Sequence, residues 1–431
     1  MSKTDHRTAI GENIHYRKLA CGLRLVILPK PNFTRKAATL CVPFGSATSK
    51  VRLGDRSEIV TFPVGTAHFL EHMLFESERD NITRRFTMLG ATVNAYTTYN
   101  RTAVYFSTTN GLIEALTVLF DMIAGAAFTA SGIAKEKAII GKEIDLYRDD
   151  FEQQMYYDLL DVMYRDNPIK NDIAGDERSL AEIDKDILDL AFKAYYHPEN
   201  MLLVLSGNID IAQVEARIAN HPLFHPDKPF LGPRKITEMD AFAPNPDRER
   251  VLDLKTDLIL MGIKLTPDAG MSEQELALAE IKHALLLDNV FGKTADTFRN
   301  LQERNVVNNA FDFSVTCDSA FGHAMLFAES KKIDTTIKAL RDVLASLPEI
   351  PVVAMNFEVQ KRKIIGNFIQ IFDSVSRANA ILTDHYARDV DVFSLIESIG
   401  RLEPADIEPL RQELAAGPVS VVRYVRKPRQ K

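Results

Sequence analysis

The sequence predicts an α+β fold built from two tandem homologous domains, each a mostly antiparallel sheet packed with helices. The chain has 431 residues, of which 46% are hydrophobic, and this is more than one ordinary compact domain requires. Six prolines between residues 221 and 250 interrupt regular structure and predict a linker at 223–250, between domains at 1–222 and 251–431. Strand-like and helix-like patterns are mixed without strict βαβ alternation, which favours a largely antiparallel sheet.

The two halves of the chain resemble each other in three segments that occur in the same order. EKAIIGKEI (136–144) parallels KRKIIGNFI (361–369), and TVNAYTTYNRTAVYFST (92–108) parallels VVNNAFDFSVTCDSAFGHAMLF (306–327). NMLLVLSGNI and PVSVVRYV then close the first and second halves. The ordered match favours duplication of one α+β unit over a chance similarity between amphipathic segments.

Local patterns predict the individual elements. GLRLVILPK (22–30) alternates apolar and polar residues, as a half-buried strand does. Residues 66–76 have a helical pattern, and 92–108 are rich in β-branched and aromatic residues that favour strands. Residues 111–128 and 132–164 predict long helices.

Composition and charge exclude several classes of partner. The formal net charge is -7 and the pI about 5.9, so nucleic acid is not an expected partner. Cys21, Cys41 and Cys317 are too few and too far apart for a disulfide framework, which fits a reducing compartment. The polar N-terminus lacks the apolar core of a signal peptide, and no apolar run is long enough to span a bilayer. We therefore expect a soluble, cytoplasmic protein that does not bind membranes.

One otherwise apolar stretch, GTAHFLEHMLFE at 65–76, carries two histidines and a glutamate. Thr66 is the expected N-cap of a helix on which His68 and His72 lie one turn apart on the same face. Two neutral imidazoles so placed can bind one zinc ion and leave a coordination position open for water. Glu71 lies near that face and can accept a proton from such a water.

The alternative is that His68 and His72 are partly buried histidines paired with Glu71, without a metal. That interpretation suits a lone histidine better than this ordered trio, because an accidental match among ten histidines has a chance of roughly one or two per cent. A zinc site also needs a third ligand, which these residues alone do not supply.

The order His-x-x-Glu-His is the inverzincin signature, and the sequence resembles the pitrilysin–insulinase family of zinc peptidases. The resemblance implies a third zinc ligand on a long downstream helix, which corresponds to Glu143, 71 residues after His72. It also implies a supporting glutamate seven positions earlier, Glu136, which can hydrogen-bond a ligand from two turns away. Without the motif, Glu143 would be an ordinary solvated helix glutamate.

The resemblance extends over most of the chain. VNAYTT places Asn94 and Ala95 at the family's Asn-Ala, which implies an edge strand whose backbone pairs with extended substrate. The alternative for Asn94 is an asparagine near a turn. Because YHPENMLLVLSGNI and the duplicated second half also match, the similarity is much more specific than the five-residue motif.

The second half departs from the family pattern. A complete member carries an Arg and a Tyr after Phe-x-x-Leu that bind substrate and stabilise the transition state. Here those positions fall on Gln302 and on Asn309, or on Phe311 if the loop is shifted. Gln302 can hydrogen-bond a carbonyl but has no charge. Phe368 is equivalent to Glu143, so we expect no metal site in this half.

The resemblance implies a zinc endopeptidase in which His68, His72 and Glu143 hold the metal and Glu71 is the general base. Family members enclose substrate in a chamber made of two such two-domain units, so short or unfolded peptides are the expected substrates. A second chain is implied, either a related subunit in a heterodimer or another copy in a homodimer. The other hypotheses are a non-catalytic peptide-binding or scaffold subunit of a peptidase complex, and a binding protein whose histidine pair is structural.

Overall fold

The computed structural model describes residues 3–8, 10–54, 59–76, 81–227, 229–236, 247–268 and 270–427. The chain forms two compact units, which are discontinuous in sequence. Unit 1 contains Met1–Tyr147, Asn171–Thr237 and Ile369–Phe393, and unit 2 contains Arg148–Lys170, Glu238–Phe368 and Ser394–Lys431. Each unit therefore contains a piece of the other sequence half. The linear domain boundaries at 222 and 251 stay a prediction.

A seven-stranded sheet forms the centre of unit 1. Its strands are β1 (Lys3–Arg7), β2 (Asn13–Lys18), β3 (Arg24–Pro29), β4 (Lys36–Val42), β7 (Thr92–Thr97), β8 (Thr102–Thr108) and β9 (Leu202–Gly207). They lie in the order β1-β2-β3-β9-β4-β8-β7. Only the β3–β9 pair is parallel. In the described part of the chain, β7 is thus an edge strand.

A second, three-stranded sheet has the order β10-β5-β6, with β5 at Lys50–Leu53, β6 at Ile59–Thr61 and β10 at Pro233–Lys235. Strand β10 lies inside the stretch that the prolines predicted to be irregular. Pro233 is its first residue, a position at which a strand tolerates the missing N–H. Residues 237–246 of the predicted linker lie outside the described residues.

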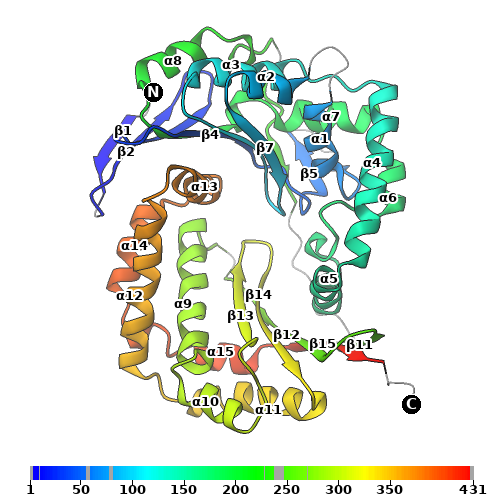
Figure 1. Cartoon of the computed structure of the whole chain (residues 1–431), viewed down its shortest axis with the longest axis vertical. Helices are drawn as coiled ribbons and strands as arrows, with labels where there is room; N and C mark the ends of the chain where they lie inside the picture. Colours follow the sequence, from blue (N-terminus) through cyan, green and yellow to red (C-terminus); the bar gives the residue numbers. More distant parts are fainter. Residues whose placement is uncertain are drawn as a thin grey trace. The chain divides into compact units, whose positions relative to one another are not determined.

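Helices cover both faces of the seven-stranded sheet. The helices of unit 1 are α1 (Thr66–Phe75), α2 (Ile82–Met88), α3 (Leu112–Ala124), most of α4 (Ala130–Asp149), α6 (Glu177–Glu182), α7 (Lys185–Tyr195), α8 (Ile211–Ala219) and α13 (Val375–Tyr386). Figure 1 shows α3 and α8 on one side of the sheet and α13 on the other. Helix α13 contacts β4 and β9, where the buried Asn379 amide donates to the carbonyl of Val204 at 3.0 Å.

Unit 2 repeats this design with a five-stranded sheet in the order β11-β15-β12-β14-β13. Its strands are β11 (Asp247–Leu252), β12 (Asp257–Leu265), β13 (Asp312–Cys317), β14 (Gly322–Ser330) and β15 (Val419–Arg426). Only β11 and β15 pair in parallel. Its helices are α5 (Phe151–Met163), α9 (Glu273–Phe291), α10 (Asp296–Glu303), α11 (Ile333–Ala345), most of α12 (Ala354–Ile371), most of α14 (Val392–Arg401) and α15 (Leu410–Ala416).

The two units are related by an exchange of helices. Helix α5 follows α4 in the first sequence half but packs on β12 and β15 of unit 2, where Asp158 accepts a 2.8 Å hydrogen bond from Tyr424. Helix α13 follows α12, the counterpart of α4, but packs on the sheet of unit 1. The α+β prediction and the two tandem domains are confirmed. Within the described ranges, no helix is both long and apolar enough to cross a membrane.

Candidate metal centre

Helix α1 begins at a position that requires glycine. Gly65 precedes the helix with φ at 87°, in the left-handed region that side chains disfavour. A Cβ there would lie 2.5 Å from the carbonyl oxygen of Ala174. The sequence predicted Thr66 as the N-cap, which is wrong, because Gly65 is the N-cap and Thr66 is the first helical residue. The Thr66 hydroxyl donates to the carbonyl of Pro63 at 2.6 Å. This entry fixes where the helix starts.

The core fixes the rotation of α1. Phe69, Leu70 and Met73 are at most 1% exposed and pack in the core of unit 1. His68 and His72 then lie one turn apart, with their ring centroids 4.7 Å from each other. His68 is buried and His72 is half-buried, so both imidazoles are held in place by their surroundings.

Helix α4 brings Glu143 to these histidines. Its Oε2 lies 3.4 Å from Nε2 of His72 and 3.7 Å from Nε2 of His68. Within the described ranges, these three residues are the only group of three or more potential ligands whose donor atoms lie within 4.8 Å of one another. The three ligands predicted from the sequence are thus brought together.

This donor set fits zinc. Zinc–nitrogen and zinc–oxygen bonds of about 2.0–2.2 Å place neighbouring ligand atoms roughly 3–3.5 Å apart, close to the separations between the carboxylate and the two rings. Two imidazoles and one carboxylate also leave a fourth position open, as in catalytic zinc sites.

A second carboxylate on α4 orients His72. Glu136 is 6% exposed, and its Oε2 lies 3.1 Å from Nδ1 of His72. A proton on Nδ1, donated to this carboxylate, leaves the Nε2 lone pair directed at the position expected for a metal. His68 differs, because its buried Nδ1 has no hydrogen-bond partner among the described residues. Glu136 therefore contacts one of the two rings, and its supporting role stays a prediction.

Glu71 is held from the neighbouring sheet. The hydroxyl of Thr97, on edge strand β7, donates to Oε2, one of the two carboxylate oxygens of Glu71, at 2.6 Å. Glu143 is held in a similar way within its own helix, because the hydroxyl of Tyr147 donates to its Oε1 at 2.5 Å. Each carboxylate thus has one oxygen engaged by a hydroxyl.

Burial and these contacts set the charge states. Burial lowers the pKa of His68 to about 4, so this ring is neutral at pH 7. The hydrogen bond with His72 lowers the pKa of Glu143 to about 2. Burial also acts to lower the pKa of His72, but its contacts with two carboxylates outweigh burial and raise that pKa. Burial raises the pKa of Glu71, which increases its affinity for a proton.

The predicted substrate residues lie on edge strand β7. Asn94 is exposed, and its Oδ1 accepts a 2.9 Å hydrogen bond from the backbone N–H of Ala95. Asn94 therefore covers an amide that would otherwise face a strand added at this edge. The same strand carries Thr97, so β7 links the predicted substrate edge with the predicted base. The substrate roles of Asn94 and Ala95 stay predictions.

The second half has no comparable cluster among its described residues. Gln302, on α10, donates from Nε2 to Oδ1 of Asn309 at 2.9 Å, and both side chains are exposed. Gln302 and Asn309, which the resemblance aligns with the family's Arg and Tyr, thus form a neutral, mutually hydrogen-bonded pair, while Phe311, the alternative for the Tyr position, is buried. Phe368 lies on α12, the counterpart of the helix that carries Glu143.

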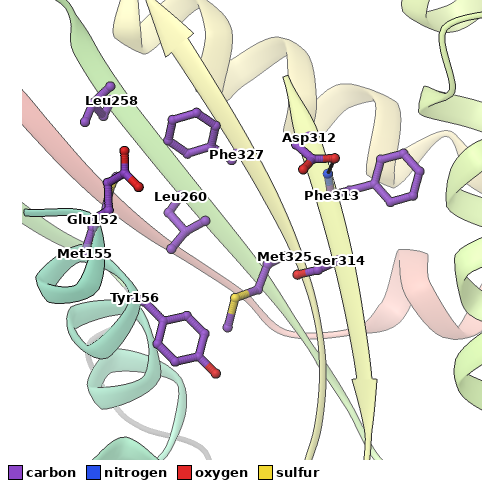
Figure 2. A pocket seen from close by; sticks show the side chains of 10 residues that line it. All are labelled: Glu152, Met155, Tyr156, Leu258, Leu260, Asp312, Phe313, Ser314, Met325 and Phe327. Carbon is purple, nitrogen blue, oxygen red and sulfur yellow. Dashed lines mark hydrogen bonds between the residues drawn. The ribbon is translucent and has the colours of Figure 1, made fainter. Parts of the chain in front are cut away.

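A cavity of about 320 Å³ lies within unit 2. Figure 2 shows helix α5 on one side of it and strands β12, β14 and β13 along the other. It is lined by Glu152, Met155, Tyr156, Leu258, Leu260, Asp312, Phe313, Ser314, Met325 and Phe327. None of the clustered potential ligands is among these lining residues.

Two residues of the candidate site were not identified from the sequence. Tyr147 lies four residues after Glu143, and this helical spacing is a signal that could have identified it. Thr97 gave no comparable signal, because its contact with Glu71 depends on how β7 lies against α1.

Comparison with known proteins identifies the class of protein that this fold and site define. The family model described as "Insulinase (Peptidase family M16)" matches residues 44–177, and "Peptidase M16 inactive domain" matches residues 182–363. The matches cover most of the chain, which therefore belongs to the M16 peptidase family. The resemblance inferred from the sequence is confirmed.

Individual relatives agree with this assignment. "Uncharacterized zinc protease YmfH" of Bacillus subtilis (strain 168) is 30% identical over 421 residues, which cover 96% of this chain and 97% of that protein. The structure of a "putative M16-like peptidase from Alicyclobacillus acidocaldarius" has the same fold, with a TM-score of 0.89, 24% identity, and coverage of 98% of this chain and 100% of that one. Pitrilysin matches with a TM-score of 0.74 and 17% identity, and the match covers 100% of this chain but 47% of pitrilysin.

Proposed function

We propose that this chain is a zinc-dependent endopeptidase that hydrolyses short or unfolded peptides. The observation that carries the proposal is the convergence of His68, His72 and Glu143, with Glu71 on the same helix as the histidines. The names of relatives, which include several zinc proteases, support the same activity.

A zinc ion bound by these three residues would supply Lewis-acid activation of a water and of the peptide carbonyl. Glu71 accepts the proton of the attacking water and returns it to the leaving amine. Its raised pKa suits this task, because a base must hold the proton long enough to transfer it. Thr97 fixes Oε2 of Glu71, which leaves Oε1 for the proton. Glu136 keeps the Nε2 lone pair of His72 directed at the metal.

Peptide binding is proposed at β7. An extended peptide can add a strand to an exposed sheet edge through backbone hydrogen bonds, and Asn94 and Ala95 lie on this strand. The Asn94 side chain must release the Ala95 amide if that amide is to bind the peptide. Because a strand-like substrate is required, folded proteins are poor substrates.

A second chain is part of the proposal. The match to about half of pitrilysin supports a chamber in which another two-domain chain supplies the remaining wall. Gln302 and Asn309 provide no positive charge for transition-state stabilisation, so we favour a heterodimer with a related subunit, and a homodimer is the alternative. None of the three cysteines, all of which lie in the described part of the chain, forms a disulfide, which fits the proposed cytoplasmic location.

One observation favours a second candidate function. The neutral Gln302–Asn309 pair is compatible with a peptide-binding or scaffold subunit that has lost catalysis. The complete set of His68, Glu71, His72 and Glu143 argues against this candidate, because a subunit without catalysis has no need of a general base.

The deciding experiment combines metal analysis with cleavage of a quenched peptide library. We expect about one zinc per chain in both wild type and Glu71→Gln, and cleavage only in the wild type. Glu114→Gln, an exposed site on α3, is the matched control. Zinc without cleavage, alone and with a related subunit added, would support the scaffold function. A chain that binds no zinc would exclude the endopeptidase. Full activity of a monomer on size exclusion would exclude the two-chain chamber.

A further inference from the structure

The contact between Tyr147 and Glu143 gives the two oxygens of this carboxylate different surroundings. Oε1 accepts the Tyr147 hydroxyl at 2.5 Å, whereas Oε2 faces Nε2 of His72 at 3.4 Å and of His68 at 3.7 Å. Tyr147 lies four residues after Glu143 on α4, so both side chains lie on one helix face. One oxygen therefore faces a hydroxyl donor and the other faces the histidines.

Packing holds the phenol in this position. Tyr147 is partly buried against the hydrophobic core of unit 1, and its helix is anchored there by Ile140 and Ile144, which are 1% and 4% exposed. A ring held in this way presents its hydroxyl at a fixed point, so the carboxylate plane of Glu143 is fixed as well.

We propose that Tyr147 is a positioning residue that restricts Glu143 to binding the metal through one oxygen. This inference rests on the zinc site proposed above. A carboxylate can bind a metal through one oxygen or two, and the second oxygen would take a coordination position that a catalytic site keeps open. The Tyr147 hydroxyl engages Oε1 and so leaves Oε2 as the ligand atom. Partners of this kind orient ligands and raise metal affinity.

Two substitutions at this position test the proposal. Tyr147→Phe keeps the ring and removes only the hydroxyl. Tyr147→Gln places an N–H donor at the same i+4 spacing, from which it can reach Glu143. Tyr16→Phe is the matched control, because it removes the hydroxyl of a half-buried tyrosine on β2 that stacks on Tyr386.

Zinc affinity by chelator competition and the visible spectrum of the cobalt(II) protein are the readouts. We expect Tyr147→Phe to weaken zinc binding about 10–100-fold, the usual effect of losing such a partner. Its cobalt absorption should weaken, because four-coordinate cobalt(II) absorbs more strongly than five-coordinate cobalt(II). Tyr147→Gln should recover part of both properties, and Tyr16→Phe should match the wild type.

The outcomes separate this inference from the proposed function. If the wild type binds zinc and Tyr147→Phe shows the same affinity and the same cobalt spectrum, the role of Tyr147 is wrong while the zinc site stands. If the wild type binds no zinc, both fail. Thermal unfolding of the metal-free variants shows whether each substitution destabilises the fold. The inference is also overturned if Tyr147→Phe binds zinc more weakly and is destabilised to a matching extent in its metal-free form, while Tyr147→Gln recovers no zinc affinity.

Discussion

The hydroxyl of Thr97 donates a 2.6 Å hydrogen bond to Oε2 of Glu71, and so ties the edge strand β7 to the helix that carries the histidines. We predict that Thr97→Val lowers kcat about 10–100-fold, because Glu71 loses its orientation. KM and zinc content should change little, since no potential ligand is altered. Thr97→Ser keeps the hydroxyl and should keep most of the activity. Steady-state kinetics with metal analysis measures these effects.

The control for this prediction is Thr117→Val on α3, which removes a hydroxyl that donates to the carbonyl of Ile113 at 2.8 Å. It should leave kcat unchanged. If kcat is unaltered in Thr97→Val, Thr97 does not act through Glu71. The same conclusion follows if KM and zinc content change while kcat does not.

Glu136 is expected to control metal affinity through His72. Its carboxylate contacts Nδ1 at 3.1 Å while 6% exposed. Glu136→Ala should weaken zinc binding about 10–100-fold. Glu136→Gln should have a smaller effect, because an amide oxygen still accepts the hydrogen bond but carries no charge. Chelator competition measures both. Equal zinc affinity in wild type and Glu136→Ala would contradict the prediction.

Zinc binding is expected to displace one proton near neutral pH. His72, with a raised pKa, is protonated below that pKa and must lose this proton to bind zinc. His68 and Glu143, with pKa values of about 4 and about 2, have already lost theirs. The dissociation constant should therefore fall about tenfold per pH unit from about pH 5 up to the pKa of His72, and level off above it. Calorimetry in buffers of different ionisation enthalpy counts the protons, and zinc binding that displaces no proton below the pKa of His72 would contradict this assignment.

The metal-free protein should show the opposite dependence. Because the pKa of His72 is raised above 6.5, its protonated form stabilises the fold fully below about pH 6.5, and this contribution is lost as the pH rises through the folded-state pKa. Metal-free wild type should therefore lose more Tm between pH 6 and pH 8.5 than His72→Gln does. Parallel Tm curves for the two proteins would exclude a raised pKa at His72.

Gly65 is expected to tolerate no side chain. Gly65→Ala combines a left-handed backbone, which costs about 1–2 kcal/mol for an L-residue, with a Cβ placed 2.5 Å from a carbonyl oxygen. Gly90→Ala is the matched control, because Gly90 has φ at 67° but open space around its Cβ. We expect Gly65→Ala to destabilise more than Gly90→Ala by at least about 1 kcal/mol. Urea unfolding of both metal-free variants measures the difference, and equal destabilisation would show that the backbone conformation alone decides.

Much of the candidate site could be predicted from the sequence because three of its residues lie within one short segment. His68, Glu71 and His72 share one helix, so spacing alone places them together. Glu143 lies on another helix, and only the family resemblance pointed to it. Thr97 could not be identified from the sequence, because its contact with Glu71 depends on tertiary packing. The N-cap was misplaced by one residue, since the requirement for Gly65 comes from the distant backbone at Ala174.

The fold class was also predictable, whereas the membership of the two units was not. Alternating and helical patterns identify strands and helices, and the ordered internal similarity indicates a duplication. An amphipathic helix shows that it covers a sheet but not which sheet, so the placements of α5 and α13 could not be inferred. Strand β10 was not predicted for a different reason, because Pro233 is the first residue of the strand, a position that tolerates a proline.

The exchange of α5 and α13 also bears on how the duplicated chain arose. A single ancestral half with this arrangement would leave its sheet uncovered, because the helix that it encodes, α5 or α13, packs on the sheet of the other half. Two separate copies with the packing seen here would cover both sheets by trading this helix, which is domain swapping. The present polypeptide corresponds to such a swapped pair joined into one chain. A break in the chain between residues 222 and 247 would therefore yield fragments that fold only in each other's presence.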